Sequence, residues 1–137
     1  MCIHLLVIYQ QILIIIDQIH ELFNGVMVGN TWHLDTKSKT IYGTFNYRGY
    51  RPEGCGVGVP SGAHYKGMAL DFDVWYGSRK LDTELVRKKI IENKDIFKGN
   101  LKGLEVAEWV HVDVMERVVQ KPGQVCVFNP AGFVRWA

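Results

Sequence analysis

Two histidines and an aspartate in this chain have the types and spacing to bind a catalytic metal ion. His64 precedes Asp71 by seven residues, and His111 follows in the segment of residues 108–113. Two imidazoles and one carboxylate are a typical set of three protein ligands for catalytic zinc, whose fourth position is left for water. Glu108, three residues before His111, is a candidate base for that water. The pattern favours zinc-dependent hydrolysis with one zinc ion per chain.

The segments that contain Asp71 and His111 alternate between apolar and polar residues, as half-buried strands do. If the two strands pair with their apolar faces on the core, Asp71 and His111 face the same cleft. Gly67 allows a turn that would fold His64 back over Asp71. The residues expected on the cleft face are Ala69, Asp71 and Asp73 of the first strand and Trp109, His111 and Asp113 of the second.

Neither histidine is a strong signal by itself. A chain with five histidines contains a His-Asp pair at this spacing by chance about one time in four. A single histidine is most simply explained as a hydrogen-bonded polar residue. The combination favours a site, because small residues at Gly67 and Ala69 accompany a strand with carboxylates and a second strand with a Glu-x-x-His pattern.

Length and composition predict one globular domain over residues 1–137. The chain is 47% hydrophobic and 22% charged, which suits a packed core. Its net charge of +2 and its scattered lysines and arginines predict no nucleic-acid partner. Cys2, Cys55 and Cys126 form no Cys-x-x-Cys pair, so we expect reduced thiols and no thiolate zinc site.

The N-terminal segment predicts a buried helix that ends near Asn24 and Gly25. Its apolar run is interrupted by two glutamines, so it is too short to span a membrane, which takes about 20 apolar residues. No Lys or Arg precedes the run, so it does not resemble a secretory signal. A membrane anchor or an uncleaved export segment is the alternative, and residues 1–12 are a candidate atypical extension.

The remaining elements predict an α+β fold with a small antiparallel sheet flanked by helices. The first two strands are expected to form a hairpin with His33 on its surface. Residues 48–60 contain four glycines and two prolines, which predicts an irregular loop leading into the His64 segment. The expected strands cover residues 26–28, 40–47, 69–74, 109–115 and 125–128, and the second helix covers residues 81–97.

These residues resemble the motifs of the zinc D-alanyl-D-alanine carboxypeptidases and L-alanyl-D-glutamate endopeptidases, whose fold is shared by the Hedgehog signalling domain. That family carries Ser-x-His-x-x-Gly-x-Ala-x-Asp, and residues 62–71 read Gly-Ala-His-Tyr-Lys-Gly-Met-Ala-Leu-Asp. Its Glu-x-x-His motif is similar to Glu-Trp-Val-His at residues 108–111, and its Ser-Gly-Tyr-Arg segment to Gly-Tyr-Arg at residues 49–51. The order and rough spacing agree over residues 13–114. The family serine is Gly62 here.

The resemblance implies a zinc peptidase that cuts peptidoglycan stem peptides, as a D,D-carboxypeptidase or an L-Ala-D-Glu endopeptidase. His64, Asp71 and His111 would bind Zn²⁺, which would lower the pKa of a bound water to ~7. Glu108 would take the proton of that water and pass it to the leaving amine. Arg51 would hold the substrate carbonyl or carboxylate.

The identity of the base is open between two glutamates. In an ideal strand, Glu108 and His111 point to opposite faces. Either Glu108 lies in a bend before the strand, or Glu105 is the base instead. The resemblance favours Glu108, and strand geometry does not.

Four further residues are expected to support the site. Asp113 and Asp73 would orient a ligand histidine or Arg51, with ordinary strand carboxylates as the alternative. Trp109 would line the substrate cleft or pack in the core. Tyr50 belongs to the Gly-Tyr-Arg segment that the resemblance covers.

Two alternative functions are open. Cys55 could be the nucleophile of a cell-wall hydrolase with His64 or His111 as its base, although no helix start follows it to lower its pKa. A zinc-containing binding module without turnover would be expected to lack the base or Arg51, and candidates for both are present. We expect a monomer whose partner is a peptidoglycan stem peptide. Without a convincing signal peptide, we expect synthesis in the cytoplasm and action on the cell wall after phage-type release, as in an endolysin.

Overall fold

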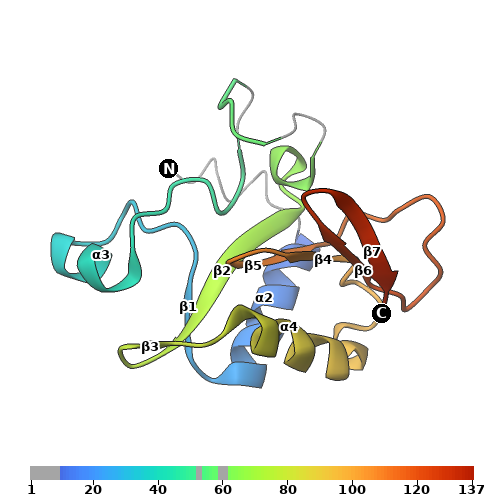
Figure 1. The fold of residues 1–137 in the computed structure, drawn as a ribbon, viewed down its shortest axis with the longest axis horizontal. Coiled ribbons are helices and arrows are strands. Elements are labelled where there is room, and N and C mark those ends of the chain that lie inside the picture. The colour runs from blue at the N-terminus through green and yellow to red at the C-terminus, as the bar shows by residue number, and fades with distance from the viewer. Residues whose placement is uncertain (1–9, 52–53, 59–61) are drawn as a thin grey trace.

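The computed structural model describes residues 10–51, 54–58 and 62–137, which form an α+β fold (Figure 1). Seven strands make one sheet in the order β1-β2-β5-β4-β6-β7, with β3 paired to β2. The strands are β1 (Val26–Val28), β2 (Ala69–Tyr76), β3 (Arg79–Lys80), β4 (Gly103–Val106), β5 (Val110–Asp113), β6 (Cys126–Asn129) and β7 (Gly132–Trp136). The helices are α2 (Gln10–Phe23), α3 (Thr36–Tyr42) and α4 (Thr83–Glu92), with 3-10 turns η1 (Ala63–Lys66) and η2 (Lys94–Phe97).

The sheet is mixed, so the expectation of an antiparallel sheet is wrong at one pair of strands. β4 and β6 run parallel, whereas the other neighbouring strands are antiparallel. After the β4–β5 hairpin, residues 114–125 carry the chain to the other side of β4, and β6 starts at the end where β4 starts. A parallel pair requires a connection of about this length, and the sequence of that segment carries no strand pattern to reveal it.

Helices α2 and α4 pack against one face of the sheet and leave the other face to the candidate ligands (Figure 1). The buried helix predicted near the N-terminus is confirmed as α2, which buries Ile12, Ile15 and Ile19, whereas Leu13 turns outward and is 38% exposed. The helix ends before Asn24, whose φ of 50° breaks the helical backbone. The largest members of the shared core are Ile12, Ile15, Ile19, Phe72, Val74, Val86, Ile90, Phe97, Leu104, Val110 and Val112.

The hairpin expected between the first two strands is wrong, because residues 36–42 form helix α3 instead of a strand. The Asp35 side chain accepts a hydrogen bond from Ser38 N (2.7 Å), which caps the start of this helix. Gly43 ends it with φ of 102°. β1 therefore pairs with β2, with Val26 opposite Trp75. Local capping outweighs the apolar alternation on which the strand was predicted.

The second predicted helix is confirmed in position but is shorter than expected. Asp82 caps α4 through hydrogen bonds from Glu84 N and Leu85 N. The helix ends at Asn93, and η2 continues from there as a tighter turn. Within the described part of the chain, no helix has the length and apolar character needed to cross a membrane.

Candidate metal centre

Four side chains from four neighbouring strands lie in one row across the open face of the sheet. The register pairs Asp71 of β2 with His111 of β5, His111 with Glu105 of β4, and Glu105 with Phe128 of β6. Residues directly opposite each other in neighbouring strands share a face and lie about 4.5–5.5 Å apart at Cβ. The predicted pairing of the Asp71 and His111 strands is therefore confirmed, with the two residues directly opposite each other.

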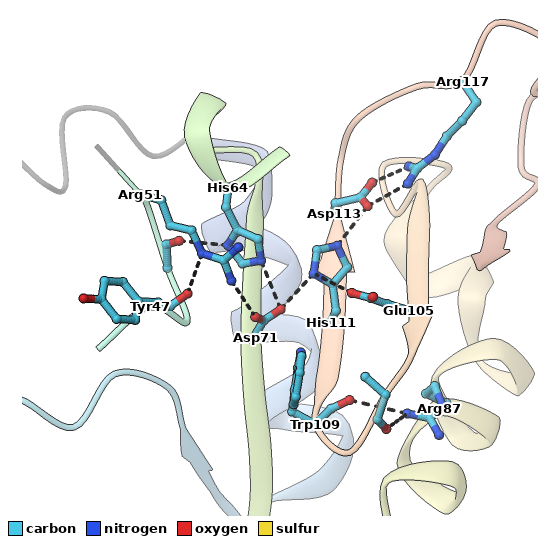
Figure 2. A network of polar contacts seen from close by, with 12 residues as sticks. Tyr47, Arg51, His64, Asp71, Arg87, Glu105, Trp109, His111, Asp113 and Arg117 are labelled. Atoms are coloured by element: carbon cyan, nitrogen blue, oxygen red, sulfur yellow. Dashed lines mark hydrogen bonds and ion pairs between the residues drawn. The ribbon is translucent and has the colours of Figure 1, made fainter. Parts of the chain in front are cut away.

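His64 joins this row from η1, the single 3-10 turn that precedes β2 (Figure 2). Gly67 ends the turn in the left-handed region with φ of 68°, where a side chain is disfavoured. Met68 N then donates to Ala63 O (2.9 Å) and closes the turn before β2 begins. The turn predicted at Gly67 therefore folds His64 back over Asp71.

Three atoms from these elements converge on one point. Asp71 Oδ1 lies 3.1 Å from His64 Nε2 and 2.8 Å from His111 Nδ1. All three side chains are buried, and one potential ligand atom from each lies within 4.8 Å of the others. Two nitrogens and one carboxylate oxygen in this arrangement fit the donor set that zinc prefers. The group could hold a metal ion.

In each histidine, the ring nitrogen that points away from Asp71 also has a hydrogen-bond partner. His64 Nδ1 lies 2.8 Å from the Gly49 carbonyl oxygen, and His111 Nε2 lies 3.1 Å from Asp113 Oδ2. A carbonyl or carboxylate acceptor keeps a proton on the nitrogen that it contacts, so the opposite nitrogen is left to bind a metal. The outer contacts therefore orient His64 Nε2 and His111 Nδ1 toward the centre.

Without a metal, the charges of the centre favour a proton on His111. Burial alone would lower the pKa of His111, but the hydrogen bonds to Asp113 and Asp71 outweigh burial and raise this pKa to about 9. Burial alone would raise the pKa of Asp71, but hydrogen bonds from His111 and His64 lower it to about 2. A metal ion would replace the proton at His111 Nδ1.

Arg117 completes the surroundings of His111, although the sequence reasoning did not identify it. Its Nη2 donates to Asp113 Oδ2 (2.9 Å), and Nη1 donates to Asp113 Oδ1. Asp113 is 1% exposed, and its hydrogen bonds from His111 and Arg117 lower its pKa despite burial. A Cβ on Gly103 would lie 2.6 Å from Arg117 Nη2, so any side chain at that position would force this ion pair to shift. Arg117 lies in an irregular segment, where no periodicity indicates its direction.

Glu105, and not Glu108, lies beside the three candidate ligands (Figure 2). Glu105 Oε2 is 3.9 Å from His111 Nδ1, and burial raises the pKa of the Glu105 carboxyl. Glu108 is exposed at the tip of the β4–β5 hairpin, where its carbonyl accepts a hydrogen bond from Lys80 Nζ (3.3 Å). The pairing of Val106 with Val110 puts Glu108 in the turn. The geometry therefore favours Glu105 over Glu108 as the base.

Arg51 lies on the opposite side of Asp71 from the histidine of β5. Its Nη2 is 3.4 Å from Asp71 Oδ2, and its Nε donates to the Tyr47 carbonyl oxygen (2.9 Å). Tyr50, the preceding residue, is half-buried. Arg51 N donates to the His64 carbonyl oxygen (3.2 Å), so the backbone of the Gly-Tyr-Arg segment is tied to the turn that carries the histidine.

Asp73 has a role other than the one expected, because its ion pairs within the described part of the chain include neither a ligand histidine nor Arg51. Its carboxylate is buried and pairs with Arg48 Nη1 (2.8 Å) and Lys80 Nζ (3.1 Å). Arg48 Nη1 also donates to the Val28 carbonyl oxygen (2.8 Å). Asp73 lies two residues beyond Asp71 on the same face, so it reaches β1 and anchors the segment that precedes Arg51.

Of the remaining predicted residues, Trp109 borders the centre and Cys55 does not. Trp109 is 37% exposed and lines a cavity together with Asp71 and Arg51. Cys55 is half-buried, and its Sγ lies 3.6 Å from the Tyr65 hydroxyl oxygen. The cysteine does not line the cavities beside the three candidate ligands.

Comparison with known proteins gives no significant match among protein-family models, curated proteins or solved structures.

Proposed function

We propose that this chain is a zinc-dependent peptidase that hydrolyses a peptide bond in peptidoglycan stem peptides. The observation that carries the proposal is the convergence of His64 Nε2, Asp71 Oδ1 and His111 Nδ1 at one buried point, with a carboxylate beside it. The motif resemblance supplies the class of substrate. The convergence rests on distances, and the resemblance rests on residue order.

The three ligands would hold one zinc ion, which when bound supplies a Lewis acid and a water of lowered pKa. Glu105 accepts the proton of the attacking water and gives it to the leaving amine. A pKa raised by burial suits this exchange, because the carboxyl can then hold the proton between the two transfers. Arg51 donates to the oxygen of the scissile carbonyl as negative charge develops there.

The direct test is zinc content measured by elemental analysis of the purified protein and two variants. We expect about one zinc per chain in the wild type and its loss in His64→Ala. His33→Ala is the matched control, because His33 is exposed and lies outside the centre. Absence of zinc from folded, metal-supplemented protein would overturn the proposal.

The activity test uses peptidoglycan fragments and separates the proposal from its two alternatives. Chelation should abolish hydrolysis and zinc should restore it, whereas alkylation of Cys55 should leave it unchanged. Sensitivity to alkylation alone would favour the Cys55 hydrolase. Zinc binding without hydrolysis would favour a non-catalytic module.

A further inference from the structure

Two cavities flank the candidate metal centre. One, of about 290 Å³, is bordered by His64, His111 and Glu105. The other, of about 240 Å³, is bordered by Asp71 and Trp109. Each volume alone is below the ~300–1,000 Å³ range of ligand sites in proteins. The candidate ligands therefore lie between two hollows of similar size.

Arg51 borders both cavities, so we place their junction at this residue. Its guanidinium is 3.4 Å from Asp71 Oδ2, so it lies next to the point where a metal would sit. Figure 2 shows Arg51 and Glu105 on opposite sides of the line from Asp71 to His111. A scissile carbonyl placed at this junction would have room for the peptide chain on each side.

We infer that the site is an endopeptidase site, which takes a peptide chain that continues through both cavities. The inference rests on the proposed function and selects one of its two possible reactions. Water adds to an internal amide carbonyl, the C–N bond breaks, and the products are a new carboxylate and a new amine. The first cavity holds the chain on one side of that bond and the second cavity holds it on the other.

A carboxypeptidase would need a free cation for the terminal carboxylate of its substrate. Arg117 borders the first cavity, but both of its Nη atoms contact Asp113. Arg48 borders the second cavity, but it pairs with the buried Asp73. Their charges are therefore offset within the protein.

Among the described residues, Arg51 is the remaining arginine of the two cavities, and the proposed function already uses it at the scissile carbonyl. Residues 52–53 and 59–61 contain no Lys or Arg in the sequence. The arginines at the outer parts of the two cavities are therefore already paired with carboxylates of the protein. Such a surface suits a peptide backbone and its side chains better than a terminal carboxylate.

Aromatic side chains give the second cavity its character. Tyr47 is 48% exposed and Trp109 is 37% exposed, and both line it together with Phe45. The partly exposed rings of Tyr47 and Trp109 supply a large apolar contact area. The Phe45 ring is already covered by the Arg48 guanidinium, which lies 3.3 Å from the ring centroid. Tyr47 and Trp109 are therefore the expected contacts of the substrate chain on this side.

The test uses one synthetic stem pentapeptide that begins with L-Ala-D-Glu and ends with D-Ala-D-Ala. It is acetylated at its N-terminus and prepared both as a C-terminal acid and as a C-terminal amide. Zinc-loaded protein should cut both forms at the same internal bond, with kcat/KM values within about threefold of each other. Mass spectrometry identifies the products.

Release of the terminal D-Ala from the acid, with the amide cut at least a hundredfold more slowly, would overturn the inference and leave the peptidase proposal intact. Absence of products from zinc-loaded protein would overturn both. The two failures are therefore distinguishable by their products.

A variant at the second cavity tests how the chain is held. Trp109→Ala and Tyr47→Ala should each lower kcat/KM for the amide at least tenfold, mainly through KM, with zinc content unchanged. Phe133→Ala is the matched control, because Phe133 is an aromatic residue on β7 that is 59% exposed and lies outside both cavities; it should change kcat/KM less than twofold. Equal effects of the cavity variants and the control would overturn the assignment of the second cavity.

Discussion

Asp113 joins the candidate ligand His111 to Arg117, so its charge should matter for both folding and metal binding. The carboxylate is 1% exposed and accepts from His111 Nε2 (3.1 Å) and Arg117 Nη2 (2.9 Å). Asp113→Asn keeps the size of the side chain and removes the charge. Arg117 then faces a neutral amide, and the amide NH₂ is a second donor opposite His111 Nε2.

The expected destabilisation follows from the burial of each partner. Breaking a buried ion pair by removing one charge costs about 3–5 kcal/mol. The Arg117 side chain is 21% exposed and can recover part of its hydration, so we expect the lower end, ~3 kcal/mol, in metal-free protein. Loss of an outer-shell partner of a ligand histidine typically lowers metal affinity by about 10–100-fold, and we expect this for zinc.

Two measurements separate folding from metal binding. Urea unfolding in the presence of a chelator gives the change in the free energy of unfolding. Competition with a chromophoric chelator in the absence of urea gives the zinc affinity. Asp95→Asn is the control, because Asp95 is an exposed carboxylate in η2 and should change neither quantity. A destabilised Asp113→Asn protein that binds zinc within twofold of wild type would refute the role of Asp113 in orienting His111.

Three other predictions test neighbouring parts of the site. Glu105→Gln should retain zinc and lose at least ~100-fold in hydrolysis, whereas Glu108→Gln should keep its activity; the opposite result in a peptide assay would restore Glu108 as the base. In metal-free protein, the pKa of His111 is raised to about 9 from 6.5, so its stabilising contribution is complete below pH 6.5 and is lost as the pH rises through 9. Urea unfolding should show a fall on the order of 3 kcal/mol over this range, absent when zinc is bound. Gly103→Ala should destabilise the protein by about 1–3 kcal/mol, because its Cβ would contact the Asp113–Arg117 pair, and an unchanged melting temperature would contradict this steric argument.

The pairing of β2 with β5 could be predicted from sequence, because side chains alternate between the two faces of a strand and the apolar ones must face the core. The apolar alternation of β2 and β5 determines which residues face the core, so it also determines which face the open side. Leu70 lies opposite Val112 and Phe72 opposite Val110, and Asp71 then meets His111. Gly67 likewise indicates its turn, because few other residues adopt the left-handed conformation readily.

The base could not be predicted in the same way, because its position depends on where a hairpin turns. Val106 pairs with Val110, so the turn is centred on Glu108, and Glu105 becomes the residue opposite His111. A shift of the turn by one residue would have changed which glutamate faces the cleft. Helix α3 was missed for a related reason, because the Asp35 cap acts locally and leaves no trace in hydrophobic periodicity.

The core and the candidate metal centre depend on the same strand register. If β5 slipped by one residue along β2, a valine would lie opposite Asp71 and His111 would turn toward the core. Val110 and Val112 are fully buried in the present register, and exposing a buried valine costs roughly 1.5–3 kcal/mol, so the slip is strongly disfavoured. The buried valines therefore hold the candidate ligand atoms in position by fixing the strand register. A metal bound to these atoms would add its binding free energy to the stability of the same register. The pKa of Asp71 is lowered beside two imidazoles, whereas burial raises the pKa of Glu105. This difference follows from the order of their strands in the sheet, β2-β5-β4.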